Sequence, residues 1–124
     1  MAFLLDASVL GALLDGSEDV QQRARTLETA PLTSVVALTM VAEKTAGDPA
    51  RSARLELIIS ALPLLSFDEV CAAKYGEIIK QVGFDWRRIL TRMIAAQAIV
   101  HRATLVTLNP TDFSDMPGLS SLAL

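Results

Sequence analysis

The chain is poor in the residues that several classes of protein depend on. Among its 124 residues there is one cysteine, Cys71, so no disulfide can form within it, and a cytoplasmic, reducing environment is expected. There is one histidine, His101, so two imidazoles cannot act as acid and base within one protomer. His101 falls at a predicted helix end, where a structural or surface role is expected. Aromatic residues make up 5% of the chain and hydrophobic residues 52%, which predicts an aliphatic core.

Positive charge and long apolar runs are also scarce. The net charge is −3, so the chain lacks the basic excess that holds nucleic acid by charge alone, and any nucleic-acid contact must be local. No apolar run reaches the roughly 18 residues of a membrane span, and the first residues lack the basic start of a signal peptide. Phosphate-loop, dinucleotide-binding, hydrolase-elbow and paired-cysteine motifs are absent, which excludes those chemistries.

Short apolar runs alternate with helical patterns along the whole chain. Strands are expected at 3–5, 31–34, 62–67 and 104–107, with an edge strand in the tail at 117–124. Helices are expected at about 9–14, 17–29, 35–44, 49–61 and 69–82, with one long helix at 85–101. This alternation predicts one α/β domain over residues 1–124, with a mostly parallel sheet of about four to five strands and helices on both faces.

Acidic residues follow several of these elements. Asp6 comes directly after the first strand, where it is either a site carboxylate or a helix cap, and Ser8 is expected to cap the helix that follows. Glu43 lies late in an apolar helix, and Asp112 follows the last clear strand. Carboxylates gathered in one cleft repel, and a divalent cation such as Mg²⁺ or Mn²⁺ resolves the repulsion. Such an ion supports hydrolysis without histidine.

Two arginines at the start of the long predicted helix form the most basic stretch. Arg88 and Arg92 are four residues apart and share one helical face. They could contact phosphates, or they could be a solvated or salt-bridged face, and the sequence leaves both open.

Several stretches, taken together and in order, resemble one family. They are Leu4–Leu10, the helix bearing Glu43, Leu65–Glu69, Met93–Ala98 and Ala103–Asn109 with the following Asp112 and Phe113. This pattern resembles the PIN-domain family and, within it, the VapC-type toxins of bacterial toxin–antitoxin pairs. The resemblance implies a ribonuclease that uses Mg²⁺ or Mn²⁺, is held inactive by a cognate antitoxin, and forms a homodimer.

The resemblance also implies site residues. Asp6 and Glu43 match the first two metal-binding acids and Asp112 a further acid, while Ser8 and Asn109 match supporting polar residues. Arg88 and Arg92 are then expected near the RNA path.

One position departs from the family pattern. Thr91 stands where the family has an acid, and a neutral hydroxyl is a poor ligand for a hard cation, so weaker metal binding is expected. The chain is then a weakly active natural variant, a binding-only member of the family, or a deliberately disabled toxin. Asp85 lies six residues upstream, and we expect it to be a helix cap.

Two other functions remain as alternatives. The first is a protein-binding module that pairs with an antitoxin or with itself and catalyses nothing. The second is a receiver-like phosphoacceptor domain, which has a similar length and clustered acids. That architecture requires a paired acid after the first strand and a lysine after the last, and neither is present.

Overall fold

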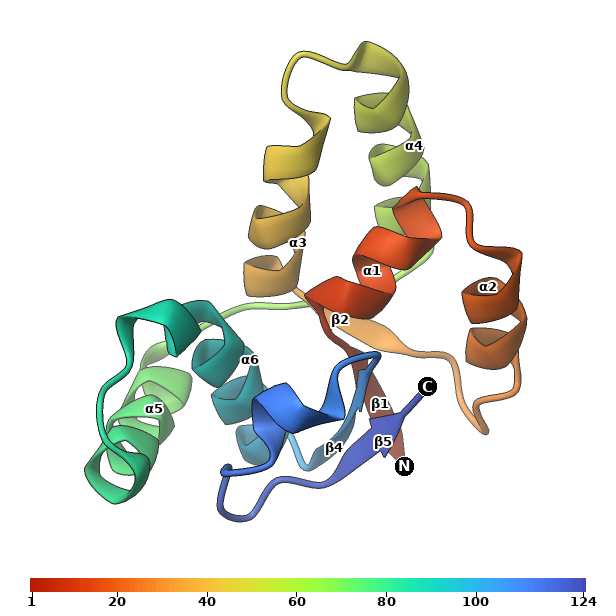
Figure 1. Cartoon of the computed structure of the whole chain (residues 1–124). Helices are drawn as coiled ribbons and strands as arrows, with labels where there is room; N and C mark the ends of the chain where they lie inside the picture. Colours follow the sequence, from red (N-terminus) through yellow and green to blue (C-terminus); the bar gives the residue numbers. More distant parts are fainter.

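A five-stranded parallel sheet forms the centre of the molecule (Figure 1). The computed structural model describes all residues from 1 to 124. The strands lie in the order β3-β2-β1-β4-β5, and every pair is parallel. They are β1 (Ala2–Leu5), β2 (Leu32–Ser34), β3 (Leu64–Leu65), β4 (Ala103–Thr107) and β5 (Ser121–Ala123). The predicted α/β class, the parallel sheet and the edge strand in the tail are confirmed.

The central strands β1 and β4 set the geometry of the site. Leu5 of β1 pairs with Val106 on one side and with Thr33 of β2 on the other. Because all strands point the same way, the residues that follow them emerge at one edge of the sheet. Asp6, Ser34 and Thr107 are therefore at or next to this carboxyl edge.

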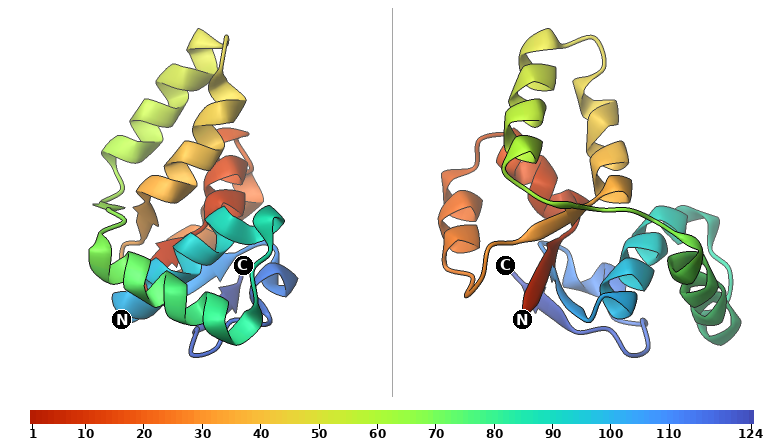
Figure 2. Two further views of the ribbon diagram at one scale, coloured as in Figure 1. Left: turned by 90° about the vertical axis from the view of Figure 1, so that its left-hand side faces the viewer. Right: turned by 180° about the vertical axis from the view of Figure 1, so that it is seen from behind.

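Helices connect the strands and cover the sheet. They are α1 (Ala7–Leu14), α2 (Glu18–Arg25), α3 (Val35–Ala42), α4 (Pro49–Ser60), α5 (Glu69–Val82) and α6 (Ile89–Val100), with 3₁₀ turns η1 (Glu43–Thr45), η2 (Trp86–Arg88) and η3 (Pro110–Phe113). Five of the α-helices begin at an Asp or Ser whose side chain accepts a backbone N–H of the first turn. α3 and α4 stand together away from the sheet, while α5 and α6 pack against each other (Figures 1 and 2).

The core lies on both faces of the sheet. Leu4 and Leu105 belong to the larger apolar cluster, together with residues of α3, α5 and α6. Phe3, Leu5 and Val106 belong to a second cluster that includes Val20 of α2. Neighbouring residues of a strand point to opposite faces, so each cluster fills one side. The prediction of helices on both faces is confirmed.

Several predicted elements differ from the structure. The helix expected at 17–29 ends at Arg25, and the one expected at 35–44 ends at Ala42 and is followed by η1. The first helix begins at Ala7 rather than near Val9, because Asp6 and not Ser8 caps it. The long helix expected over 85–101 is divided into η2 and α6, since the Asp85 side chain accepts the Arg87 N–H and starts a separate turn. β3 contains only Leu64 and Leu65, because Pro63 has no N–H to donate. No helix combines the length and the apolar character needed to cross a membrane.

Candidate functional site

Asp6 is a buried carboxylate at the carboxyl edge of the sheet. It is 4% exposed, and its Oδ1 accepts hydrogen bonds from Ser8 Oγ at 2.6 Å and from the Val9 N–H at 3.1 Å. Its Oδ2 accepts no hydrogen bond from the protein. A buried carboxylate needs partners, and here one oxygen is used by the helix while the other remains available. Asp6 is thus a helix cap that still has one oxygen to offer to a ligand.

Hydroxyl groups connect Asp6 to the end of β4. Ser8 Oγ accepts the Leu108 N–H at 3.0 Å and lies 3.5 Å from Thr107 Oγ1. Because Ser8 gives its only proton to Asp6, Thr107 is the donor between the two hydroxyls. Thr107 Oγ1 in turn accepts the Asn109 N–H at 3.0 Å. The structure places Ser8 beside Asp6 as predicted, whereas Thr107 was missed, although it is a polar residue at the end of a buried strand.

Asn109 and Asp112 lie on the segment that leaves β4. Both are exposed, and their side chains make no hydrogen bond within the chain. The backbone carbonyl of Asp112 accepts a hydrogen bond of 3.2 Å from Arg88 Nη1. Arg88 Nε is also 3.6 Å from Asp85 Oδ2. Arg88 is therefore held against η3, next to one of the predicted site acids.

Glu43 does not join the other predicted acids. Since Leu5 pairs with Thr33, Asp6 and Ser34 stand at the same level of the sheet edge. Glu43 is exposed and follows Ser34 by nine residues, which is about 13 Å of helical rise. No group of three or more carboxylate, thiol or imidazole side chains in the chain could hold a metal ion. α3 therefore carries Glu43 about two and a half helical turns beyond Ser34, and its role as a metal ligand stays a prediction.

Thr91 and Arg92 lie in the first turn of α6 and differ sharply in environment. Thr91 is half-buried, and its hydroxyl makes no hydrogen bond. Arg92 is 4% exposed: Nη1 donates to the Gly83 carbonyl at 2.6 Å, and Nη2 donates to Asp115 Oδ2 at 3.3 Å. A buried guanidinium with these partners ties two loops to α6. The predicted RNA contact is therefore not retained for Arg92, whereas the exposed part of Arg88 still permits one.

The donors at this edge suit a hard divalent cation of limited affinity. Asp6 offers one free carboxylate oxygen. Asp112 offers an exposed carboxylate in the segment that follows β4, the strand paired with β1. Mg²⁺ is commonly held by one or two carboxylates together with water and substrate phosphates. The residues present fit that arrangement and do not fit a closed site of three protein carboxylates.

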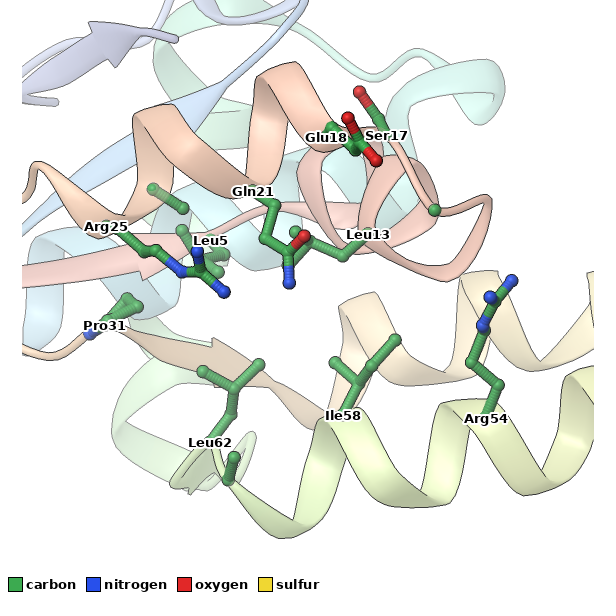
Figure 3. Close-up of a pocket in the computed structure, with 13 residues that line it drawn as sticks. Leu5, Leu13, Ser17, Glu18, Gln21, Arg25, Pro31, Arg54, Ile58 and Leu62 are labelled. Atoms are coloured by element: carbon green, nitrogen blue, oxygen red, sulfur yellow. The ribbon is translucent and has the colours of Figure 1, made fainter.

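A separate cavity lies on the other side of α1 (Figure 3). It has a volume of about 590 Å³ and contains none of the predicted site residues. Its apolar lining includes Leu5, Leu13, Ile58 and Leu62, and the polar side chains around it include Glu18, Gln21, Arg25 and Arg54. α1, α2 and α4 surround it, so it is a groove between helices rather than part of the carboxyl edge.

Known proteins resemble the chain over its full length. Residues 3–119 match the family model described as PIN domain. The structure of VapBC2 from Rickettsia felis bound to a promoter DNA fragment contains a similar chain, with a TM-score of 0.87, 21% identity, and coverage of 100% of this chain and 99% of that one. No curated protein sequence matches the chain.

Two further solved structures give the same result. The chain in DNA-bound VapBC from Salmonella typhimurium has a TM-score of 0.79 and 21% identity, covering 99% of this chain and 98% of that one. The chain in FitAcB from Neisseria gonorrhoeae has a TM-score of 0.79 and 24% identity, covering 97% and 96%. At these identities the likeness establishes the fold.

Proposed function

The chain belongs to the PIN domain family, and we propose that it is the toxin of a toxin–antitoxin pair, built as a metal-dependent RNA endonuclease whose activity is reduced by Thr91. The observation that carries this proposal is the environment of Asp6. A buried carboxylate at the carboxyl edge of a parallel sheet has one oxygen fixed by Ser8 and Val9 and the other without a partner. A toxin–antitoxin complex from Klebsiella pneumoniae contains a chain of similar fold, which supports the pairing.

The residues at the carboxyl edge would have different roles in binding the cation and the RNA phosphate. Asp6, with Asp112, would hold Mg²⁺ or Mn²⁺, and the bound cation supplies orientation of the phosphate and activation of water. Ser8 and Thr107 fix the orientation of Asp6 through their hydrogen bonds. Arg88 lies beside Asp112 and can bind a phosphate oxygen. Thr91 offers a neutral oxygen where a third carboxylate would complete the cation site, so weak binding and slow cleavage follow.

The other components of the proposal concern partners. The groove between α1, α2 and α4 has an apolar floor and a charged rim, which suits an amphipathic helix of the antitoxin. We also propose a homodimer, as the family resemblance implies. We propose a cytoplasmic location as well, in keeping with the single, buried cysteine.

A protein-binding module without catalysis is the second candidate. It is favoured by one observation, namely that no three acidic side chains come together to hold a metal ion. Such a module would act through the antitoxin or through self-association alone.

The test measures RNA cleavage and metal binding on the same antitoxin-free preparation. We expect slow cleavage of RNA with Mn²⁺ or Mg²⁺, none with a chelator, and none for Asp6→Asn. A rise in thermal stability with Mn²⁺ that Asp6→Asn abolishes is expected as well. If Mn²⁺ neither stabilises the protein nor supports cleavage, the binding module is the better account.

A further inference from the structure

The chain exposes two of its six aromatic side chains, and both lie at the same corner. Phe84 is 66% exposed and Trp86 is 71% exposed. The other four aromatic side chains pack in or against the core: Phe3, Phe67, Tyr75 and Phe113. Both residues belong to the connection between α5 and α6, which runs along an outer edge of the molecule (Figure 1). Large exposed apolar groups that lie close together mark interaction sites.

The backbone that carries these rings is firmly held. Arg92 Nη1 donates to the Gly83 carbonyl at 2.6 Å, directly before Phe84. After Phe84 in the sequence, the Asp85 carboxylate accepts the Arg87 N–H at 3.0 Å. The Asp85 carbonyl accepts the Arg88 N–H at 3.0 Å. The backbone that presents the two exposed rings is therefore held in place, which lowers the entropy cost of binding to them.

Positive charge accompanies the rings. The Arg87 side chain is 76% exposed, and its guanidinium carbon lies 5.9 Å from the centroid of the Trp86 ring. The neighbouring Arg88 side chain is 39% exposed. Asp85, the only acid in this stretch, accepts the Arg87 N–H and lies 4.0 Å from Arg87 Nε and 3.6 Å from Arg88 Nε, so one carboxylate faces two guanidinium groups and the stretch keeps a positive charge. In a chain of net charge −3, this corner is a local cationic patch interleaved with aromatic rings.

The corner is continuous with the candidate site. Arg88 follows Trp86 by two residues and donates to the Asp112 carbonyl at 3.2 Å. A strand of nucleic acid lying across the rings would therefore pass Arg88 and reach the segment that bears Asp112.

We propose that Phe84, Trp86, Arg87 and Arg88, here called the aromatic corner, bind single-stranded RNA by stacking its bases and pairing with its phosphates. The inference rests on the proposed function and names its substrate class. Aromatic side chains stack on unpaired bases, whereas the bases of a duplex hide their faces. A second copy fits less well, because a twofold interface would place Arg87 and Arg88 against the same patch.

Trp86 is the only tryptophan, so its fluorescence reports directly on this corner. The probe is an oligouridylate of about ten nucleotides, titrated into the protein with a chelator present so that nothing is cut. We expect saturable quenching by the single strand and at least about tenfold weaker binding of the corresponding duplex. Anisotropy of a labelled oligonucleotide then compares the variants.

Matched variants separate stacking from general surface effects. Trp86→Ala and Phe84→Ala should each weaken binding by roughly 5- to 150-fold, whereas Leu57→Ala, at an equally exposed apolar residue on α4, should not. Arg87→Gln should lower the slope of log affinity against log salt by about 0.7, whereas Arg23→Gln, at an exposed position on α2, should leave it unchanged. Circular dichroism checks that each variant is folded.

The outcomes distinguish this inference from the proposed nuclease. If the Trp86 and Phe84 variants bind RNA as tightly as the unaltered chain, the aromatic corner is overturned, even if RNA is cleaved. If the unaltered chain binds no RNA and Trp86→Ala converts a dimer to a monomer, the corner is an interface between copies and the inference fails. Binding that requires Trp86, in a chain that never cleaves RNA, supports the corner and argues against the nuclease.

Discussion

The hydroxyl of Ser8 donates a 2.6 Å hydrogen bond to the carboxylate of Asp6 while accepting the N–H of Leu108. This one side chain joins the end of β1, the first turn of α1 and the end of β4. The carboxylate at the centre of the proposed site is thus oriented by a segment about a hundred residues away in the sequence. Its position depends on correct pairing of the two central strands.

Replacing Asp6 separates its structural role from its proposed ligand role. Asn retains an oxygen that can cap α1, so Asp6→Asn should leave the free energy of unfolding nearly unchanged, while Asp6→Ala should lower it by about 0.5–2 kcal/mol. Both should lose Mn²⁺ binding, because neither carries the charge. Urea denaturation and Mn²⁺ titration measure the two effects. Unchanged Mn²⁺ affinity in Asp6→Asn would show that Asp6 is a cap and nothing more.

Gln97 connects three elements at the same edge and should be important for stability. It is fully buried; its Nε2 donates to the Leu65 carbonyl at 3.2 Å and to the Ser66 carbonyl at 3.0 Å, and its Oε1 accepts from Ser34. Gln97→Leu keeps the volume but leaves these groups unpaired, so the free energy of unfolding should fall by roughly 1–3 kcal/mol. Gln81→Leu, at an exposed position on α5, is the control. Equal denaturation midpoints for the two variants would argue against the network.

The thiol of Cys71 predicts an alkaline loss of stability. Burial raises the pKa of this thiol, and a hydrogen bond with the Asp68 side chain adds to the shift. Since the folded state favours the protonated thiol, its contribution is complete below the pKa of the unfolded thiol. It is lost as the pH rises through the folded-state pKa. We expect slow reaction of the native protein with a thiol reagent at neutral pH and rapid reaction in urea.

The control for this prediction is Cys71→Ala. The variant should show a shallower fall in the free energy of unfolding at alkaline pH, because it lacks the thiol whose pKa is raised in the folded state. Identical alkaline profiles would contradict the assigned cause.

Local sequence patterns predicted the sheet because its central strands are short, apolar and bounded by helix-capping residues. Asp6 and Ser8 could be predicted for the same reason, since they lie next to a strand end. The position of an acidic residue far along a helix was harder to predict from the sequence. Glu43 is conspicuous in an apolar segment, but the pattern does not show how far α3 carries it from the sheet edge.

Contacts between distant segments account for the other differences. The spacing of Arg88 and Arg92 predicted a shared face, and both do reach the segment after β4. Arg92 is buried because it donates to the Gly83 carbonyl and to Asp115. The local sequence around Arg92 does not predict either contact. Thr107 was missed because its role comes from Ser8, which is 99 residues away in the sequence.

We propose that a PIN-type cation site centred on Asp6 is incomplete at Thr91. The most direct test of this proposal is RNA cleavage with Mn²⁺ or Mg²⁺ by antitoxin-free Thr91→Asp beside the unaltered chain. Ser52→Asp, which adds the same charge at an exposed position on α4, is the control. We predict that Thr91→Asp cleaves RNA much faster and binds Mn²⁺ more tightly, while Ser52→Asp matches the unaltered chain. If Thr91→Asp gains neither cleavage nor Mn²⁺ affinity, the proposed site is wrong.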